Sequence, residues 1–308
     1  MNKNRRIPPY LQALIAREKL PPQFSASVET VVLPLAGAIA EQWRQQGERT
    51  IILGINGAQG TGKSTLTLFL GAVLSRDYGL NIAGFSLDDL YLTRAERARL
   101  AAEIHPMFRV RGVPGTHDIA MGQTILDQLA GADGETVTRI PVFDKAIDDR
   151  KPDSDWKTVR GRPDLIIIEG WCVGAMPEPA EALTAPINKL EAERDAEGRW
   201  RRHVNRQLAS VYRAFFDRID WLLMLKAPGW EQVYHWRLLQ ENKLGELVKS
   251  DRSSGDNVMT PEQVRDFIQY YQRLTVHQLS EIPARADAVI DVDAGHQWRS
   301  LGGPLVDE

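Results

Sequence analysis

The stretch Thr50–Thr65, TIILGINGAQGTGKST, constrains the fold of this chain more than any other. Its first part, Ile51–Ile55, is a nearly continuous apolar run, which is typical of a parallel strand covered on both faces. Gly57, Gly60 and Gly62 follow, and they let the backbone curl with its N–H groups pointing inward. Such a nest at a helix N-terminus holds polyphosphate through backbone hydrogen bonds and the positive end of the helix dipole.

The segment from Gly57 to Ser64 matches the P-loop pattern G-x-x-x-x-G-K-[ST] at every fixed position. We expect Lys63 to contact the β- and γ-phosphates and the hydroxyl of Ser64 to ligate magnesium. The helix that follows has apolar residues at helical spacing, which disfavours a glycine turn with a purely connecting role. The predicted nucleoside triphosphate site comprises Gly57, Ala58, Gln59, Gly60, Thr61, Gly62, Lys63, Ser64 and Thr65.

Composition limits the class of protein. The 308 residues are 43% hydrophobic, enough for one large α/β domain or two small ones, and a net charge of −3 gives no basic field for nucleic acid. Cys172 is the only cysteine, which excludes an intramolecular disulfide and fits a reducing cytosol. Prolines follow the basic Met1–Arg6 in place of a signal sequence, and the apolar stretch Val31–Ala40 is too short to span a bilayer. We expect a cytoplasmic protein without nucleic-acid or membrane partners.

Residues 1–48 are predicted to form an N-terminal helical extension, and residues 49–308 the P-loop domain. The expected helices are Tyr10–Lys19 and Ser25–Gln46, the second bent near Pro34. Neither helix carries recognisable chemistry. We therefore expect them to pack on the core or at a subunit contact of a homo-oligomer.

From Thr50 onward, apolar strands alternate with amphipathic helices, which predicts parallel pairing through right-handed crossovers. The expected fold is α/β, a P-loop nucleoside triphosphate hydrolase fold with a doubly wound, mainly parallel sheet and a helical lid. Its ligand site should lie at the C-terminal ends of the strands. A polar insertion is expected at Ala175–Glu197 and a polar break at Lys249–Asn257. The later strands are expected at Asn81–Ser86, Val137–Phe143, Leu165–Glu169, Trp221–Leu225 and Ala288–Val292.

Acidic residues end two of these strands. Asp88 and Asp89 follow the second strand, where a kinase needs a carboxylate to orient the acceptor hydroxyl and take its proton. Their placement in a P-loop fold favours this role over an exposed Asp–Asp turn. Glu169 ends an apolar strand, where an acid can hold magnesium directly or through water.

Basic residues crowd the loops expected around the acceptor pocket, and an anionic acceptor explains them because arginine binds carboxylate or phosphate in two parallel hydrogen bonds. Some must simply be solvated. We favour Arg111 and His117 as substrate-binding residues, because glycine and proline fix their loop. Arg237 lies in the helix after the fifth strand, where a cation could close over the γ-phosphate or remain on the helix surface. The basic set is Arg109, Arg111, His117, Arg139, Lys145, Arg150 and Lys151.

Two other patterns are set aside. Arg199–Arg202 contains a tryptophan that belongs to an apolar helical stripe, so we interpret the arginines as the solvated face of a helix. Asn188–Glu191 resembles the guanine-binding NKxD motif, but it has Glu in place of Asp and follows no buried strand.

Several motifs together resemble one family in consistent order over roughly Thr50 to Asp293. They are GAQGTGKST, SLDDLYLT, RGVPGTHD, PVFDKAIDDR, IIIEGWCVG, WRLLQE and YYQRLT. This combination resembles the ATP-dependent D-glycerate 3-kinases, which group with phosphoribulokinase, uridine kinase and pantothenate kinase among P-loop kinases. The N-terminal helices fall outside the resemblance.

The resemblance implies ATP and Mg²⁺ as cofactors and a small anionic hydroxy acid, D-glycerate, as the acceptor that becomes 3-phosphoglycerate. By similarity to the D-S-F-Y type segment of the relatives, Asp88 takes the general-base position and Tyr91 a pocket position. Asp89 replaces a small polar residue there, so either aspartate is a candidate base. The alternatives are a kinase for another small metabolite, such as pantothenate or uridine, and a nucleotide-switched binding protein.

Overall fold

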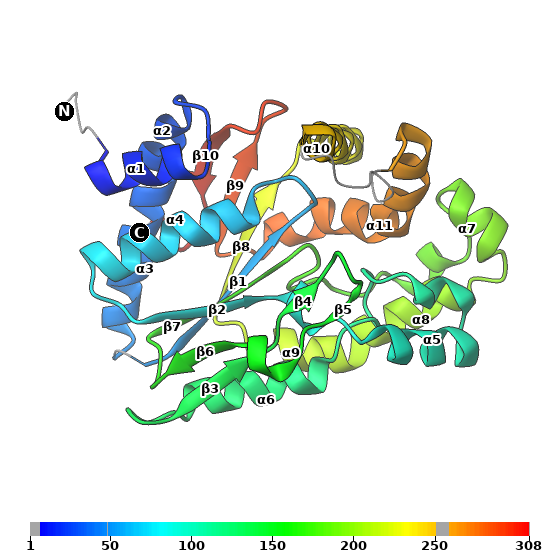
Figure 1. The fold of residues 1–308 in the computed structure, drawn as a ribbon, viewed down its shortest axis with the longest axis horizontal. Coiled ribbons are helices and arrows are strands. Elements are labelled where there is room, and N and C mark those ends of the chain that lie inside the picture. Colours follow the sequence, from blue (N-terminus) through cyan, green and yellow to red (C-terminus); the bar gives the residue numbers. More distant parts are fainter. Residues whose placement is uncertain (1–6, 48, 251–258, 308) are drawn as a thin grey trace.

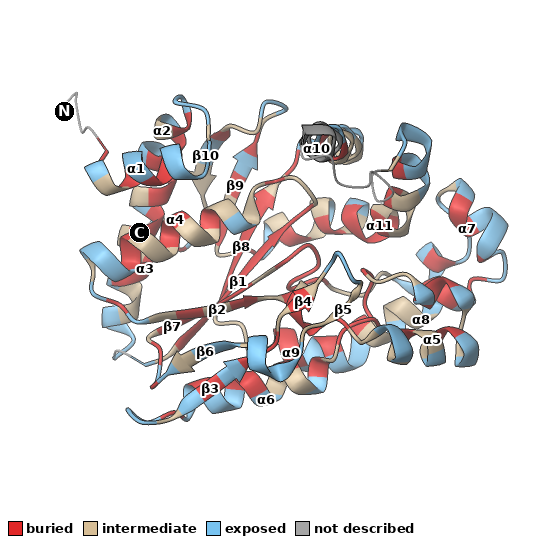
Figure 2. Cartoon of the chain, in the orientation of Figure 1, coloured by how far each residue is buried: buried red, intermediate tan, exposed pale blue. Residues whose placement is uncertain are grey.

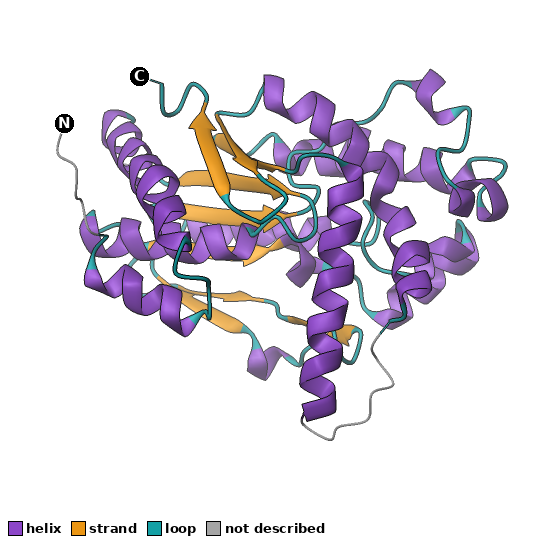
Figure 3. Ribbon diagram, turned by 90° about the horizontal axis from the view of Figure 1, so that it is seen from above, coloured by secondary structure: helices purple, strands orange, loops and turns teal. Residues whose placement is uncertain are grey.

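The computed structural model describes residues 7–47, 49–250 and 259–307, with the backbone alone for 243–250. A six-stranded sheet in the order β10-β9-β8-β1-β7-β2 forms the centre of the molecule, and helices cover both of its faces (Figures 1 and 3). All neighbouring strands are parallel except β10, which runs antiparallel to β9. The strands are β1 (Ile51–Gly57), β2 (Ile82–Ser86), β7 (Leu165–Gly170), β8 (Trp221–Lys226), β9 (Ala288–Val292) and β10 (Trp298–Gly302).

The two faces of the sheet have separate apolar clusters. Ile51, Leu53 and Ile55 of β1 pack with the N-terminal helices and α4, whereas Ile52 packs on the opposite face with α6 and α9. Figure 2 shows the buried residues along the strands and on the helix faces turned toward them. The helices are α1 (Pro9–Arg17), α2 (Phe24–Ser27), α3 (Leu33–Gln45), α4 (Lys63–Asp77), α5 (Arg94–Glu103), α6 (Ile119–Ala130), α7 (Lys189–Arg194), α8 (Arg199–Gln207), α9 (Arg213–Phe216), α10 (Trp230–Ser250) and α11 (Pro261–Glu281).

The predicted α/β fold with a mainly parallel sheet is therefore confirmed, but the expected third strand does not belong to that sheet. β3 (Val137–Ile140) pairs antiparallel with β6 (Lys157–Arg160) in a separate ribbon. Its residues alternate between exposed and buried, and Val137 is 47% exposed. A strand with one wet face suits an antiparallel ribbon, whereas the central strands are buried on both faces.

The remaining part of that predicted strand begins a small hairpin. β4 (Phe143–Asp144) pairs with β5 (Asp149–Arg150), so the segment PVFDKAIDDR folds back on itself beside the end of β2. The strand β10 was not predicted, because its sequence WRSLG has little apolar character.

The predicted second helix is a continuous helical stretch, Phe24–Gln45, of 22 residues. A π-helical turn, Val28–Val32, precedes Pro34, which lies in the first turn of α3. By length and composition alone, this helix could cross a bilayer, so the expectation that the apolar region is too short to do so is wrong. Half of its most apolar window is nevertheless buried inside the protein, as in a core helix of a folded domain.

The segment expected to be a polar insertion is fixed by buried ion pairs. Arg273 of α11 contacts Glu191 at 2.7 Å, and Arg201 contacts Asp195 at 3.1 Å with both side chains 1% exposed. The interpretation of Arg201 as solvated is therefore wrong, because Asp195, which precedes α8, lies beside its guanidinium and neutralises its charge. The expected polar break at Lys249–Asn257 lies largely outside the described residues.

Candidate active site

The P-loop joins β1 to α4 and depends on glycine at two positions. Gly60 and Gly62 have φ angles of +85° and +94°, in the left-handed region that glycine enters without steric cost. A Cβ atom on Gly60 would also lie only 2.7 Å from the Cβ of Trp236. The loop can therefore hold its backbone N–H groups toward a ligand only with glycine at these positions.

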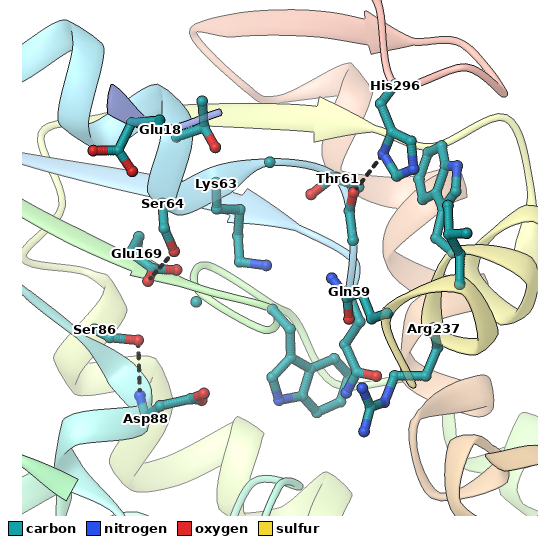
Figure 4. Close-up of a pocket in the computed structure, with 18 of the residues that line it drawn as sticks. Glu18, Gln59, Thr61, Lys63, Ser64, Ser86, Asp88, Glu169, Arg237 and His296 are labelled. Carbon is teal, nitrogen blue, oxygen red and sulfur yellow. Dashed lines mark hydrogen bonds between the residues drawn. The ribbon is translucent and has the colours of Figure 1, made fainter. Parts of the chain in front are cut away.

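A cavity of about 850 Å³ opens above this loop at the C-terminal ends of the strands (Figure 4). It brings together most of the predicted site residues, although they come from five separate parts of the chain. Gly57, Ala58 and His117 are the predicted residues that do not line it. The predicted residues that line it are Gln59, Gly60, Thr61, Gly62, Lys63, Ser64, Thr65, Asp88, Tyr91, Arg111, Glu169 and Arg237.

Lys63 and Ser64 begin α4 beneath the cavity. The Nζ atom of Lys63 lies 3.3 Å from the carbonyl oxygen of Ala58, and the Ser64 hydroxyl donates to Glu169 Oε1 at 3.2 Å. Loss of hydration lowers the pKa of Lys63, while the carboxylates of Glu169 and Asp88 act in the opposite direction. The Lys63 ammonium and the neighbouring oxygen atoms of Ser64 and Glu169 therefore lie together at the end of the cavity formed by the P-loop.

The neighbouring aspartates at the end of β2 have different environments. Asp89 accepts hydrogen bonds from the backbone N–H groups of Ser86 at 3.2 Å and Phe143 at 3.3 Å, and it does not line the cavity. Asp88 lines the cavity and accepts a hydrogen bond from Lys145 Nζ at 2.6 Å. Burial would raise the pKa of Asp88, but the charge and hydrogen bond of Lys145, together with smaller effects of His117 and the Tyr91 hydroxyl, hold that pKa below its usual value.

Tyr91 forms part of the cavity wall, and His117 stands behind it. Their rings stack with centroids 4.5 Å apart, and the Tyr91 hydroxyl is hydrogen-bonded to Asp88. The Nδ1 atom of His117 lies 2.6 Å from the hydroxyl of Tyr212, and burial lowers the pKa of His117 to about 4. The structure therefore keeps His117 neutral and away from the cavity surface.

Two members of the predicted basic set, Arg111 and Lys145, line the cavity. Arg111 pairs with Asp148 of the β4–β5 hairpin, and its guanidinium lies over the ring of Phe143, 5.5 Å from the centroid. Lys145 belongs to the same hairpin, between β4 and β5. This hairpin therefore brings both cations to the end of the cavity where Asp88 stands.

Arg237 reaches the cavity from α10. It pairs with Glu241 on its own helix and lies over the ring of Phe267, 5.7 Å from the centroid. In Figure 4 its side chain lies on the same side of Lys63 as Asp88.

Sequence and structure comparisons place this site in a known group. No protein-family profile matches the chain. The uncharacterized kinase mug58 of Schizosaccharomyces pombe is 34% identical over 266 residues, covering 83% of this chain and 91% of that one. The chloroplastic D-glycerate 3-kinase of Arabidopsis thaliana is 29% identical over 72% of this chain and 46% of its own length. The chain belongs to the D-glycerate 3-kinase family. A solved structure of D-glycerate 3-kinase from Cryptococcus neoformans has a TM-score of 0.72 and 25% identity, over 88% of this chain and 98% of that one.

This P-loop kinase has site residues that sequence reasoning did not assign. Tyr271 of the YYQRLT motif donates its hydroxyl to the carbonyl oxygen of Arg111 at 3.3 Å and is hydrogen-bonded to the Gln59 side chain. His296 contacts the carbonyl oxygen of Gly60 at 3.0 Å through Nδ1 and stacks on Trp236 at 4.7 Å. The motif pointed to Tyr271, but only the tertiary structure shows that its hydroxyl joins the P-loop to the Arg111 loop.

Proposed function

We propose that this kinase transfers the γ-phosphate of ATP to D-glycerate, giving ADP and 3-phosphoglycerate. The observation that carries the proposal is one cavity in which the P-loop faces Asp88 and the two cations Arg111 and Lys145. A polyphosphate site beside a carboxylate fits phosphoryl transfer to a hydroxyl, and the cations fit an acceptor with a carboxylate. The D-glycerate 3-kinases of Arabidopsis and Cryptococcus among the similar proteins support this choice of acceptor.

The nucleotide phosphates would be held by the backbone of Gly57–Thr65, with Lys63 reaching the β- and γ-phosphates. Ser64 and Glu169 offer neighbouring oxygen atoms 3.2 Å apart, the ligand type that Mg²⁺ requires. Mg²⁺ commonly takes one or two protein oxygens and completes its shell with phosphate and water, so these residues fit it. When bound, the ion would neutralise charge on the β- and γ-phosphates.

At the acceptor end, Arg111 would bind the glycerate carboxylate and Tyr91 would form the adjacent wall. The acceptor hydroxyl oxygen bonds to the γ-phosphorus while the bond from that phosphorus to the oxygen bridging to ADP breaks. Its electron pair leaves with ADP, and Asp88 takes the hydroxyl proton. Lys145 must leave Asp88 for this, and its departure would raise the pKa of Asp88 and make it a stronger base.

Arg237 and His117 would act less directly. Arg237 would exchange Glu241 for the γ-phosphate and stabilise the charge in transfer. His117 would act on the acceptor only through the stacked ring of Tyr91.

A panel of ATP-dependent phosphorylation assays tests the proposal. The acceptors are D-glycerate, L-glycerate, glycolate, pantothenate and uridine, with an ATP-only control. We expect the highest kcat/KM for D-glycerate. Efficient phosphorylation of uridine or pantothenate with glycerate ignored would overturn the acceptor and leave a small-molecule kinase. Phosphorylation of no acceptor, with ATP hydrolysis stimulated by a protein partner, would favour a nucleotide-switched protein.

A further inference from the structure

The N-terminal extension reaches the cavity through the turn between α1 and α2. This turn, Glu18–Pro21, lines the same cavity as the P-loop and Asp88. Its sequence, EKLP, matches no nucleotide-binding motif, and the sequence motifs that resemble the glycerate kinases begin only at Thr50. Its presence at the cavity is therefore a property that only the tertiary structure reveals.

The turn is held firmly against the P-loop helix and β10. Beyond the turn, Phe24 packs edge-to-face on Phe69 of α4 at 5.4 Å and on Trp298 of β10 at 5.0 Å. Before the turn, the Tyr10 hydroxyl donates to Asp77 at the end of α4 at 2.6 Å. The turn is therefore fixed to the helix that begins at the P-loop and lines the same cavity.

The backbone changes direction at Lys19, directly after the end of α1. Its φ angle is +53°, in the left-handed region that few residues other than glycine enter. The Lys19 and Leu20 N–H groups donate to Ala16 at 3.1 Å and Ile15 at 3.0 Å, which ends α1 and redirects the chain. This pair of hydrogen bonds around a left-handed residue is a common way for a helix to end, and it fixes where the turn leaves α1.

The position of the turn indicates which part of a nucleotide it meets. In Figure 4, Glu18 and His296 lie above Lys63, and Asp88 and Arg237 lie below it. Phosphate transfer toward Asp88 requires the γ-phosphate to point to that side. Because the triphosphate is a linear chain, its nucleoside must leave the P-loop toward the side of Glu18.

We propose that the Glu18–Pro21 turn binds the nucleoside half of ATP, with the Glu18 carboxylate accepting hydrogen bonds from the ribose hydroxyls. A carboxylate has two oxygens and can accept from both hydroxyls of a vicinal diol. Leu20 and Pro21 supply apolar contact area for the base. The inference rests on the proposed ATP site, and it assigns the N-terminal extension a direct part in nucleotide recognition.

Isothermal titration calorimetry with three probes tests this assignment. ATP, 2′-deoxy-ATP and inorganic tripolyphosphate, each with Mg²⁺, are titrated into the wild-type protein and into Glu18→Ala, Glu18→Gln and Glu29→Ala. Glu29 is an exposed carboxylate of the same N-terminal segment that does not line the cavity, so it is the matched control. Among the described residues, the ion-pair partner of Glu18 is the 65% exposed Arg17, so removal of the Glu18 carboxylate should leave folding intact.

We expect Glu18→Ala to weaken ATP binding roughly ten- to a hundredfold, the usual effect of losing hydrogen bonds to a charged group. Tripolyphosphate should bind equally well or slightly more tightly, because a negative charge is gone. Glu18→Gln should lose less than Glu18→Ala, and both should lose less with 2′-deoxy-ATP, since one partner hydroxyl is already absent. Glu29→Ala should match the wild type with every probe.

Equal losses for ATP and tripolyphosphate in Glu18→Ala, or no loss for ATP, would overturn the role of the turn while leaving the P-loop site standing. A wild-type protein that binds neither probe would instead overturn the proposed nucleotide site itself.

Discussion

Replacement of each neighbouring aspartate by asparagine separates the two roles that the structure gives them. In Asp88→Asn the side chain still fits the cavity wall but can no longer accept a proton from the acceptor. In Asp89→Asn one of two carboxylate oxygens becomes an amide nitrogen. Since both oxygens of Asp89 accept from backbone N–H groups, of Ser86 and Phe143, one of these donors then loses its acceptor.

The expected magnitudes differ in kind. General-base groups contribute about 10²- to 10⁴-fold, so Asp88→Asn should lower kcat at least about a hundredfold with the affinity for ATP nearly unchanged. Its effect on stability should be under about 1 kcal/mol, because Lys145, its ion-pair partner, is 61% exposed. Asp89→Asn should instead cost about 1–3 kcal/mol of unfolding free energy for the unpaired buried donor, a fall of a few degrees in Tm.

The assay combines steady-state kinetics with varied acceptor and ATP and thermal unfolding of both variants. A larger loss of kcat in Asp89→Asn, with a Tm equal to the wild type, would make Asp89 the base. Phosphorylation by Asp88→Asn within a few-fold of the wild type would remove Asp88 from the chemistry.

Three further predictions concern the same cavity. Arg111→Ala should raise the KM for the acceptor roughly ten- to a hundredfold and leave the KM for ATP nearly unchanged, and Arg111→Lys should restore only part of the loss. The control is Arg109→Ala, which removes an exposed arginine nearby. Equal effects of the two alanine variants would refute specific binding of the acceptor by Arg111. Tyr271→Phe should weaken the coupling between ATP and acceptor affinities, measured by titrating each in the presence of the other, whereas Tyr270→Phe, which lies outside the cavity lining, should not. The pKa of His117 is about 4 in the folded protein and about 6.5 when unfolded, so the unfolded state binds more protons between these values. The stability contributed by His117 should thus be complete above about pH 6.5 and should fall as the pH decreases toward 4, by up to about 3 kcal/mol. Urea unfolding at several pH values measures this for the wild type and for His117→Gln. If both proteins lose the same unfolding free energy over this pH range, another group is responsible.

The sequence by itself determined the features that depend on local backbone chemistry. The glycines of Gly57–Ser64 predict a backbone nest that binds phosphate. The apolar runs of β1, β7 and β8 predict strands that are covered on both faces. Placement of Asp88 and Glu169 at the site follows from the same rule, because parallel strands bring their C-terminal ends to one edge of the sheet. The family resemblance rested on these same local motifs.

Only the tertiary structure decided where neighbouring side chains point. Asp88 and Asp89 are adjacent in sequence, and it is the Phe143 N–H group of a distant hairpin, with the Ser86 cap, that turns Asp89 away from the cavity. The S-x-x-D pattern Ser86–Asp89 is a local signal of that cap, but it says nothing of Phe143.

The same reason explains the other differences. Arg201 is buried because Asp195 and two backbone carbonyls reach it, and helical periodicity records only which face it lies on. Val137–Ile140 does not belong to the central sheet, although its strand propensity is high. A strand joins that sheet only when both of its faces are buried, and this depends on contacts with distant parts of the chain. The Glu18–Pro21 turn reaches the cavity because Phe24 packs between Phe69 and Trp298, residues separated from it by long stretches of chain. Such contacts are non-local, so no pattern within the turn itself could encode them.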